Sequence, residues 1–174
     1  MLRFEKIPYK QFCEDMVKIY GGLNLTEDFL KNTYDSIKLP RRATGWSAGY
    51  DFYALIDETI YPESQALVIP TGIKFCTDDP TDVLLIFPRS GLGFKKGAYL
   101  ENTVGIIDAD YQFAKNYGHI MIKMGCRLDS VHLVPGEAFC QGIITSFQKT
   151  DDDNPVSWDR EGGFGSTTEK TKNI

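Results

Sequence analysis

The sequence lacks the features that mark a zinc, redox, membrane or DNA-binding protein. Its four cysteines are scattered and form no C-x-x-C pair, so neither a zinc site nor a redox motif is indicated. No apolar run approaches the roughly 18 residues of a membrane-spanning helix, and the first residues contain no apolar signal segment. The net charge is −5, whereas a surface for duplex nucleic acid normally carries a basic field. We therefore expect a cytoplasmic protein with reduced thiols that contacts neither membranes nor nucleic acid.

Length and composition favour one globular domain with an extension. The chain has 174 residues, of which 42% are hydrophobic and 25% charged, an ordinary balance for a globular protein. We expect a helical N-terminal extension over residues 1–38, a β-rich domain over residues 39–158 and a C-terminal arm over residues 159–174.

The N-terminal extension has the pattern of two short helices. Apolar residues recur at helical spacing from Phe12 onward and again from Leu30 onward, and two glycines at positions 21 and 22 separate the stretches. Thr26 precedes two acidic residues and is predicted to cap the second helix, which Pro40 stops. The extension either packs on the domain or binds a partner.

After residue 39 the pattern is that of an all-β protein. Short apolar or alternating runs are separated by Pro, Gly and Asp clusters, which is typical of a β-sandwich or barrel. The runs cover residues 66–69, 83–87, 120–124 and 143–147. Residues 162–172 are rich in Gly, Ser, Thr and Lys and are predicted to form a mobile tail.

Two polar segments at predicted strand ends are candidates for anion binding. Asp51 lies between aromatic and apolar residues, where its carboxylate binds a ligand or satisfies nearby backbone groups. Arg89, Ser90 and Gly91 follow an apolar run and offer a guanidinium fork, a hydroxyl and accessible backbone N–H groups, which suit phosphate oxygens. A polar loop with a solvated basic edge is the alternative for this second segment.

A third segment contains the candidate general base. Asp108 follows two branched apolar residues, so its carboxylate is expected to be partly desolvated, as a general base often is. Asp110 would share a strand face with Asp108, although turn residues are a commoner use of an Asp-x-Asp segment. Asn102 carries a donor and an acceptor and is therefore suited to an amide-like base edge.

Two further segments complete the polar set. Gln141 begins an apolar run, where a glutamine is more often structural than functional. Phe164 is embedded in glycines on the predicted tail, so we expect it to stack on a planar group rather than join a core. A linker with a single aromatic residue is the alternative.

These segments occur in the order AGYDFYA, PRSGLG, NTVGIIDADYQ, GEAFCQ and GGFGST, within residues 48–168. In this order they resemble the five motifs of the homotrimeric all-β dUTPases, over about two-thirds of the chain. The resemblance implies a distorted jelly-roll β-barrel and a homotrimer with shared active sites. It also implies hydrolysis of dUTP to dUMP and pyrophosphate, which limits uracil incorporation into DNA and supplies dUMP for dTMP synthesis.

The resemblance assigns roles at the base, sugar and reacting water. Asp108 matches the catalytic aspartate that activates the water attacking the α-phosphorus. Tyr111 resembles the tyrosine that packs under the deoxyribose and leaves no room for a 2′-hydroxyl. The implied base- and sugar-contacting positions also include Asn102, Gly105, Ile106, Ile107 and Met121.

The resemblance also assigns the phosphates and the metal. Asp51 matches an aspartate that reaches Mg²⁺ through water, while the ion is held mainly by the substrate triphosphate. Phe164 resembles the C-terminal phenylalanine that closes over uracil. The implied phosphate- and arm-contacting positions are Arg89, Ser90, Gly91, Gln141, Arg160, Gly165, Ser166 and Thr167. No histidine base is needed, so His119 and His132 are expected to be ordinary strand or surface residues.

The chain departs from the family pattern at several positions. Residues 113–117 intervene before Gly118, which indicates a small insertion in the hairpin loop and affects the placement of Met121. Ala138 stands where a basic residue is common, and Gly142 where a larger apolar residue is usual. Arg160 lies one residue closer to the phenylalanine than in many members, and a threonine at position 168 replaces the usual glycine.

Two other functions are compatible with this fold. A dCTP deaminase would need a glutamate at the base and usually an Arg-Ser-Ser loop, whereas this chain has Arg-Ser-Gly and Asp-x-Asp-Tyr. A dUTPase-like regulatory binding module is the second alternative, and the N-terminal helices leave room for such a role. Both cellular and viral sources carry enzymes of this family.

Overall fold

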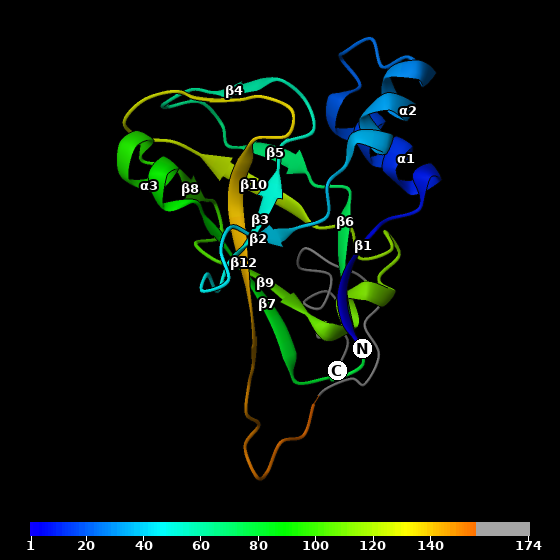
Figure 1. Cartoon of the computed structure of the whole chain (residues 1–174), viewed down its shortest axis with the longest axis vertical. Coiled ribbons are helices and arrows are strands. Elements are labelled where there is room, and N and C mark those ends of the chain that lie inside the picture. The colour runs from blue at the N-terminus through cyan, green and yellow to red at the C-terminus, as the bar shows by residue number, and fades with distance from the viewer. Residues whose placement is uncertain (156–174) are drawn as a thin grey trace, which may run out of the picture.

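Antiparallel strands dominate residues 1–155, the part of the chain that the computed structural model describes (Figure 1). The N-terminal elements are β1 (Leu2–Lys6), α1 (Tyr9–Tyr20), α2 (Glu27–Ser36), β2 (Arg41–Arg42), β3 (Tyr50–Tyr53), β4 (Glu58–Ile60), β5 (Leu67–Pro70) and β6 (Ile73–Thr77). The chain continues through β7 (Asp82–Pro88), α3 (Ser90–Lys96), β8 (Tyr99–Leu100), β9 (Gly105–Asp108), the 3₁₀ helix η1 (Ala109–Phe113), β10 (Met121–Gly125), β11 (Val131–Leu133) and β12 (Ala138–Ser146). The expected mainly β fold is confirmed, and it is jelly-roll-like.

The described strands form four sheets rather than one closed barrel. The largest has the order β2-β3-β12-β7-β9, and a second has the order β5-β10-β8. Two-stranded sheets join β1 with β6 and β11 with β4. The long strand β12 runs through the middle of the molecule, as Figure 1 shows, and pairs with β7 from Cys140–Pro88 to Ser146–Asp82.

The core fills the space between these sheets. Fully buried side chains come from β3, β6, β7 and β12, and they include Phe52, Phe75, Leu84 and Phe139. Gly142 on β12 belongs to this packing, because a Cβ there would lie 2.7 Å from Leu84 Cδ1 and 3.0 Å from Phe52 Cε2. The absence of a larger residue at position 142 is therefore a consequence of close packing in this chain.

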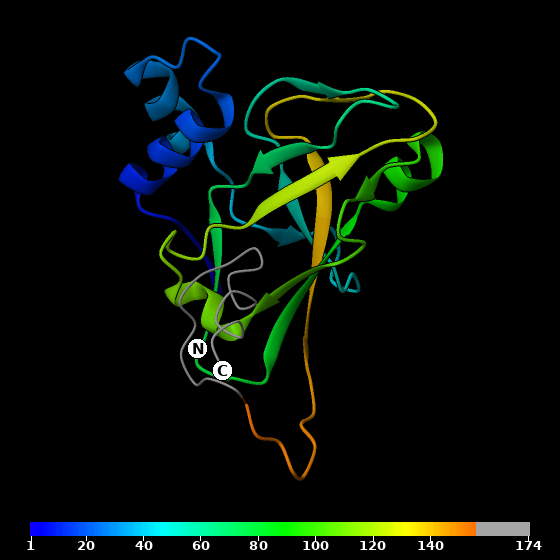
Figure 2. The same ribbon diagram turned by 180° about the vertical axis from the view of Figure 1, so that it is seen from behind.

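The two predicted N-terminal helices are confirmed as α1 and α2. Thr26 caps α2, since its side chain accepts a hydrogen bond from the Phe29 N–H at 3.2 Å, and two acids occupy the first turn. Phe12 and Met16 on α1 are fully buried, so this helix packs on the β core. Both helices lie together at one corner of the molecule, away from α3 (Figures 1 and 2).

One strand of the extension was not predicted. β1 pairs with β6 along its whole length, from Leu2 opposite Thr77 to Lys6 opposite Ile73. Phe4 on this strand packs against the rings of Tyr50, Phe52 and Phe75 with centroid separations of 5.3, 5.5 and 6.0 Å. The extension therefore starts as part of the β structure and is helical only from residue 9.

All four cysteines are free thiols, and Cys76, Cys126 and Cys140 are buried. Within residues 1–155, no helix is long and apolar enough to cross a membrane.

Candidate functional site

A pocket of about 410 Å³ lies between β9, η1 and β10, and we call it the base pocket. Six of the positions assigned to the base and sugar line it, namely Asn102, Gly105, Ile106, Ile107, Tyr111 and Met121. Val68, Leu100, Glu101, Ile122 and Lys123 complete the wall. Met121 reaches the pocket despite the insertion of residues 113–117, so the inserted loop leaves this strand in place.

The entry to β9 is shaped by a tight turn after β8. The Thr103 N–H donates to the Leu100 carbonyl at 2.9 Å, and Thr103 adopts a left-handed φ of 67°. The next strand residue, Gly105, lies directly against Ile86, because a Cβ at this glycine would be 3.0 Å from the Ile86 Cβ. Only a glycine lets β9 approach β7 this closely, which fixes the backbone that faces the pocket.

Tyr111 is held by the inserted loop. The residue is 5% exposed, and its hydroxyl donates to the His119 carbonyl at 3.0 Å. Asn116 of the insertion donates through Nδ2 to the same hydroxyl at 2.9 Å. Sequence reasoning missed Asn116 as part of the site, although the insertion itself was the signal that marked its position.

The candidate base Asp108 stands at the end of β9, directly after Ile107 of the base-pocket wall, although Asp108 itself does not line the pocket. It is half-buried and lies opposite Val83 of β7. The expectation that Asp108 and Asp110 share a strand face is wrong, because the 3₁₀ helix η1 begins at Ala109. The Gln112 side chain fastens this helix by donating to the carbonyls of Thr77 and Ala109, both at 2.8 Å.

A second set of predicted residues, which we call the Arg89 cluster, lies at the ends of β3, β7 and β12. The Arg89 Nε lies 3.4 Å from Asp51 Oδ1, and the side chains are 45% and 15% exposed, respectively. Gln141 lies opposite Asp51 in the β12–β3 pair, so their side chains share a face of the sheet. Gly49 makes room for Gln141, since a Cβ at this glycine would lie 2.5 Å from Gln141 Oε1.

Ser90 and Gly91 of the Arg89 cluster are the first two residues of helix α3. Their N–H groups are the first two of the helix, where no carbonyl of the preceding turn is available to accept. Arg89 precedes them in extended conformation, and its N–H donates to the Phe139 carbonyl at 3.2 Å. Lys95 and Lys96 end the helix, and Gly97 closes it with a φ of 65°.

The base pocket and the Arg89 cluster are separate in one chain. None of Asp51, Arg89, Ser90 and Gln141 lines the base pocket. Figures 1 and 2 place α3, which follows Arg89, far from η1, which follows Asp108. The two groups therefore lie at different places on the described chain.

The two histidines differ in their environment. His132 is exposed and lies 3.7 Å from Asp57 Oδ2. His119 is fully buried, and its Nδ1 lies 2.7 Å from Asp15 Oδ2 on helix α1. The Gly72 N–H donates to the other ring nitrogen, Nε2, at 2.9 Å. His119 is therefore more than an ordinary strand residue, because it joins the N-terminal extension to the segment that supports Tyr111.

Five predicted positions of the C-terminal arm, Arg160, Phe164, Gly165, Ser166 and Thr167, lie outside the described residues. Within residues 1–155, no group of three or more His, Cys, Asp or Glu side chains is arranged to hold a metal ion.

Comparison with known proteins places these features in one family. The dUTPase family model matches residues 35–168. A deoxyuridine 5′-triphosphate nucleotidohydrolase from Aeromonas salmonicida is 42% identical over 136 residues, which are 74% of this chain and 86% of that protein. The crystal structure of a dUTPase from Streptococcus mutans matches with a TM-score of 0.59 and 30% identity, covering 86% of this chain and 98% of the other. A mutant dUTPase from phage phi11 of S. aureus, described as coordinating a structural Mg(II) ion, has a TM-score of 0.56 and 19% identity, covering 71% and 93% of the two chains.

Proposed function

This chain belongs to the dUTPase family, and we propose that it hydrolyses dUTP to dUMP and pyrophosphate by attack of water on the α-phosphorus. One observation carries the proposal: the base pocket and a half-buried carboxylate, Asp108, are built by consecutive elements of one hairpin. A base bound in this pocket brings its sugar and α-phosphate toward the carboxylate.

Recognition of uracil falls to the wall of the base pocket. The Asn102 amide and the backbone of Ile106 and Ile107 offer donors and acceptors to the uracil edge, and Gly105 lets this backbone come close. Met121 contributes an apolar contact from β10. A pocket that hydrogen-bonds one base edge discriminates strongly against a base that leaves those groups unpaired.

Tyr111 discriminates between deoxyribose and ribose. Its hydroxyl donates a hydrogen bond to the His119 carbonyl and accepts one from Asn116, and these two bonds fix the orientation of the ring. A sugar packed on the fixed ring has no space for a 2′-hydroxyl. The insertion therefore contributes to sugar selection through Asn116.

Asp108 acts as the general base. Its carboxylate accepts a proton from the attacking water while the water oxygen bonds to the α-phosphorus. The bond from that phosphorus to the bridging oxygen breaks, and pyrophosphate leaves with the electron pair. The position of Asp108 directly after Ile107, a residue of the base-pocket wall, supports this role.

Charge on the triphosphate is neutralised by the residues of the Arg89 cluster and by Mg²⁺. Arg89 and the N–H groups of Ser90 and Gly91 offer hydrogen bonds to phosphate oxygens, and Gln141 adds an amide on the same face as Asp51. Mg²⁺ commonly binds through one or two carboxylates, waters and substrate phosphates, so a single carboxylate such as Asp51 fits this ion. When bound, the ion neutralises phosphate charge.

The separation of the two residue groups supports a homotrimer with shared sites. In this assembly the base pocket of one chain faces the Arg89 cluster of a second chain. The C-terminal arm, with Arg160, Phe164, Gly165, Ser166 and Thr167, closes the site over the base and terminal phosphates. We expect light scattering to give the mass of three chains, and a fully active monomer would refute the shared site.

The decisive experiment measures product from dUTP, dCTP and dTTP in the presence of Mg²⁺. We expect pyrophosphate from dUTP alone, and no ammonia from dCTP. The dCTP arm is needed because Glu101 lines the base pocket, and a deaminase needs a glutamate at the base. Ammonia from dCTP would replace the proposed function by deamination, and no product from any nucleotide would leave only a binding module.

The residue-level test compares Asp108→Asn with Asp152→Asn, a substitution at an exposed aspartate outside the site. We expect the first variant to lose turnover by at least about a hundredfold, since general bases contribute roughly 10²–10⁴ in rate. It should bind dUTP nearly as well as the original chain, because the carboxylate acts on water. A large loss of dUTP affinity with normal turnover would contradict the assignment.

A further inference from the structure

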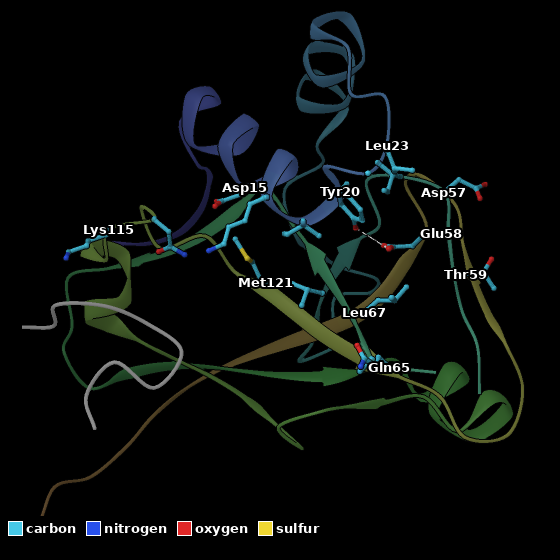
Figure 3. A pocket seen from close by; sticks show the side chains of 17 residues that line it. Asp15, Tyr20, Leu23, Asp57, Glu58, Thr59, Gln65, Leu67, Lys115 and Met121 are labelled. Carbon is cyan, nitrogen blue, oxygen red and sulfur yellow. Dashed lines mark hydrogen bonds between the residues drawn. The ribbon is translucent and has the colours of Figure 1, made fainter. Parts of the chain in front are cut away.

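A second cavity, of about 1170 Å³, lies between helix α1 and strands β4, β5 and β10 (Figure 3). We call it the helix cavity. One wall is supplied by the C-terminal half of α1, which precedes residue 35, where the match to the family model begins. Much of its lining is apolar and includes Ile19, Leu23, Ile56, Leu67, Val68 and Met121. A concave apolar site with a few polar groups is the usual form of a small-molecule site.

Glu58 is the distinctive polar group of the helix cavity. Both of its oxygens lie within hydrogen-bond distance of the Tyr20 hydroxyl, at 3.1 and 3.2 Å, as Figure 3 shows. One hydroxyl supplies a single hydrogen, whereas a carboxylate has about four acceptor positions. Burial raises the pKa of Glu58 to about 7, and burial together with this carboxylate raises the pKa of Tyr20, which therefore keeps its proton as the donor. A ligand that brings a hydrogen-bond donor to Glu58 would offset the cost of burying this group.

The ends of the helix cavity differ in charge. Figure 3 shows Asp57, Glu58 and Thr59 at one end and Lys115 at the opposite end, with Leu67 and Met121 between them. Asp15 lies on the Lys115 side, where its carboxylate is hydrogen-bonded to the buried His119. Lys18 of α1 is a second cation in the lining. This polarity is complementary to a molecule with an amino group at one end, a flat apolar middle and an anionic group at the other end.

The helix cavity also touches the machinery of the base pocket. Val68 and Met121 line both cavities. Asn116 lines the helix cavity and donates to the Tyr111 hydroxyl at 2.9 Å. Asp15 lines it as well and holds His119, whose carbonyl accepts from that hydroxyl. An occupant of the helix cavity therefore contacts side chains that position the sugar-facing tyrosine.

We infer that the helix cavity is an effector site for a small amphoteric ring compound, with its amino group on Glu58, its ring over Leu67 and Met121, and its anionic group toward Lys115. Deoxynucleoside monophosphates with amino-bearing bases, such as dCMP and dAMP, have this chemistry. The effect on dUTP turnover rests on the proposed function, whereas binding itself does not.

The first test is calorimetric titration of the full chain with dCMP and dAMP, and with dTMP as a probe that lacks the amino group. We expect saturable binding of dCMP or dAMP at least about tenfold tighter than that of dTMP, because a charge-assisted hydrogen bond is lost with the amino group. Glu58→Gln and Lys115→Ala should each weaken this binding about tenfold. The control Lys31→Ala, at an exposed lysine of α2, should leave it unchanged.

Each outcome bears on the inference. Binding of only one of the two probes identifies the base, while equal binding of all three, or no saturable binding, overturns the inference. Binding that survives both Glu58→Gln and Lys115→Ala also overturns it, since the probe would then lie elsewhere. Lys115→Ala removes an exposed side chain, so its result does not depend on the folding of the Glu58 variant.

The second test is kinetic. The bound probe should change the KM for dUTP at least about twofold in the original chain but not in Glu58→Gln. Binding without any kinetic change would refute the coupling and leave the site intact. Loss of all dUTP turnover in the original chain would count against the proposed function alone, because the titration does not use turnover.

Discussion

The buried contact between Asp15 and His119 gives the sharpest prediction on stability. The Gly72 N–H donates to His119 Nε2, so Nε2 carries a lone pair and the ring proton stands on Nδ1, which donates to Asp15 Oδ2 at 2.7 Å. Asp15→Ala leaves this buried N–H without its acceptor and removes a buried side chain from the middle of α1. A buried unsatisfied donor costs about 1–3 kcal/mol, and loss of a charged partner lies at the upper end, so we expect the free energy of unfolding to fall by about 3 kcal/mol. For a chain of this length that corresponds to a melting temperature about 6–12 °C lower.

The assay is thermal and urea unfolding of Asp15→Ala, Asp15→Asn and Glu14→Ala. Asn at position 15 still offers an oxygen to Nδ1, so the loss should be only about 1 kcal/mol. Glu14 is the matched control, because it is the preceding residue on α1 and its side chain is exposed. If Asp15→Ala and Glu14→Ala melt at the same temperature, the contact does not stabilise the fold and the reasoning is wrong.

Three other perturbations follow from single contacts. Burial raises the pKa of Glu58 to about 7, so the folded state binds more protons than the unfolded state. The contribution of Glu58 to stability therefore falls as pH rises from about 4.5 to about 7. Glu58→Gln should flatten this fall in a series of melting curves. Gly142→Ala should lower the free energy of unfolding by about 1–3 kcal/mol through overpacking, whereas Gly45→Ala, with no atom within 4 Å of the added Cβ, should change it little in the same denaturant titration. Asn116→Ala removes hydrogen bonds to the Tyr111 hydroxyl, the His119 carbonyl and the Gly118 N–H, and it should weaken discrimination between dUTP and UTP, measured as the ratio of the two kcat/KM values.

Local patterns in the sequence predicted what depends on neighbours in the chain. The apolar runs became strands, and the Thr26 cap and the helix spacing from Phe12 were confirmed, since these signals lie within a few residues of one another. Six of the eleven residues that line the base pocket were among the predicted site residues, because these six fall in one continuous hairpin and its following strand.

Features that depend on distant partners were missed. β1 has a short alternating pattern, but its pairing with β6 joins residues about seventy positions apart, such as Phe4 and Phe75. His119 was expected to be ordinary because its partner, Asp15, is 104 residues away in sequence. The helix cavity exists only after α1 has packed on β5, so no single segment of the sequence contains its signal.

The separation of the base pocket from the Arg89 cluster has a genetic consequence. In the proposed assembly, a chain damaged at Asp108 still lends an intact Arg89 to its neighbour, and a chain damaged at Arg89 still lends an intact Asp108. When two such chains assemble together, some sites receive only undamaged halves. Two separately inactive alleles would therefore restore part of the activity when they are expressed in the same cell.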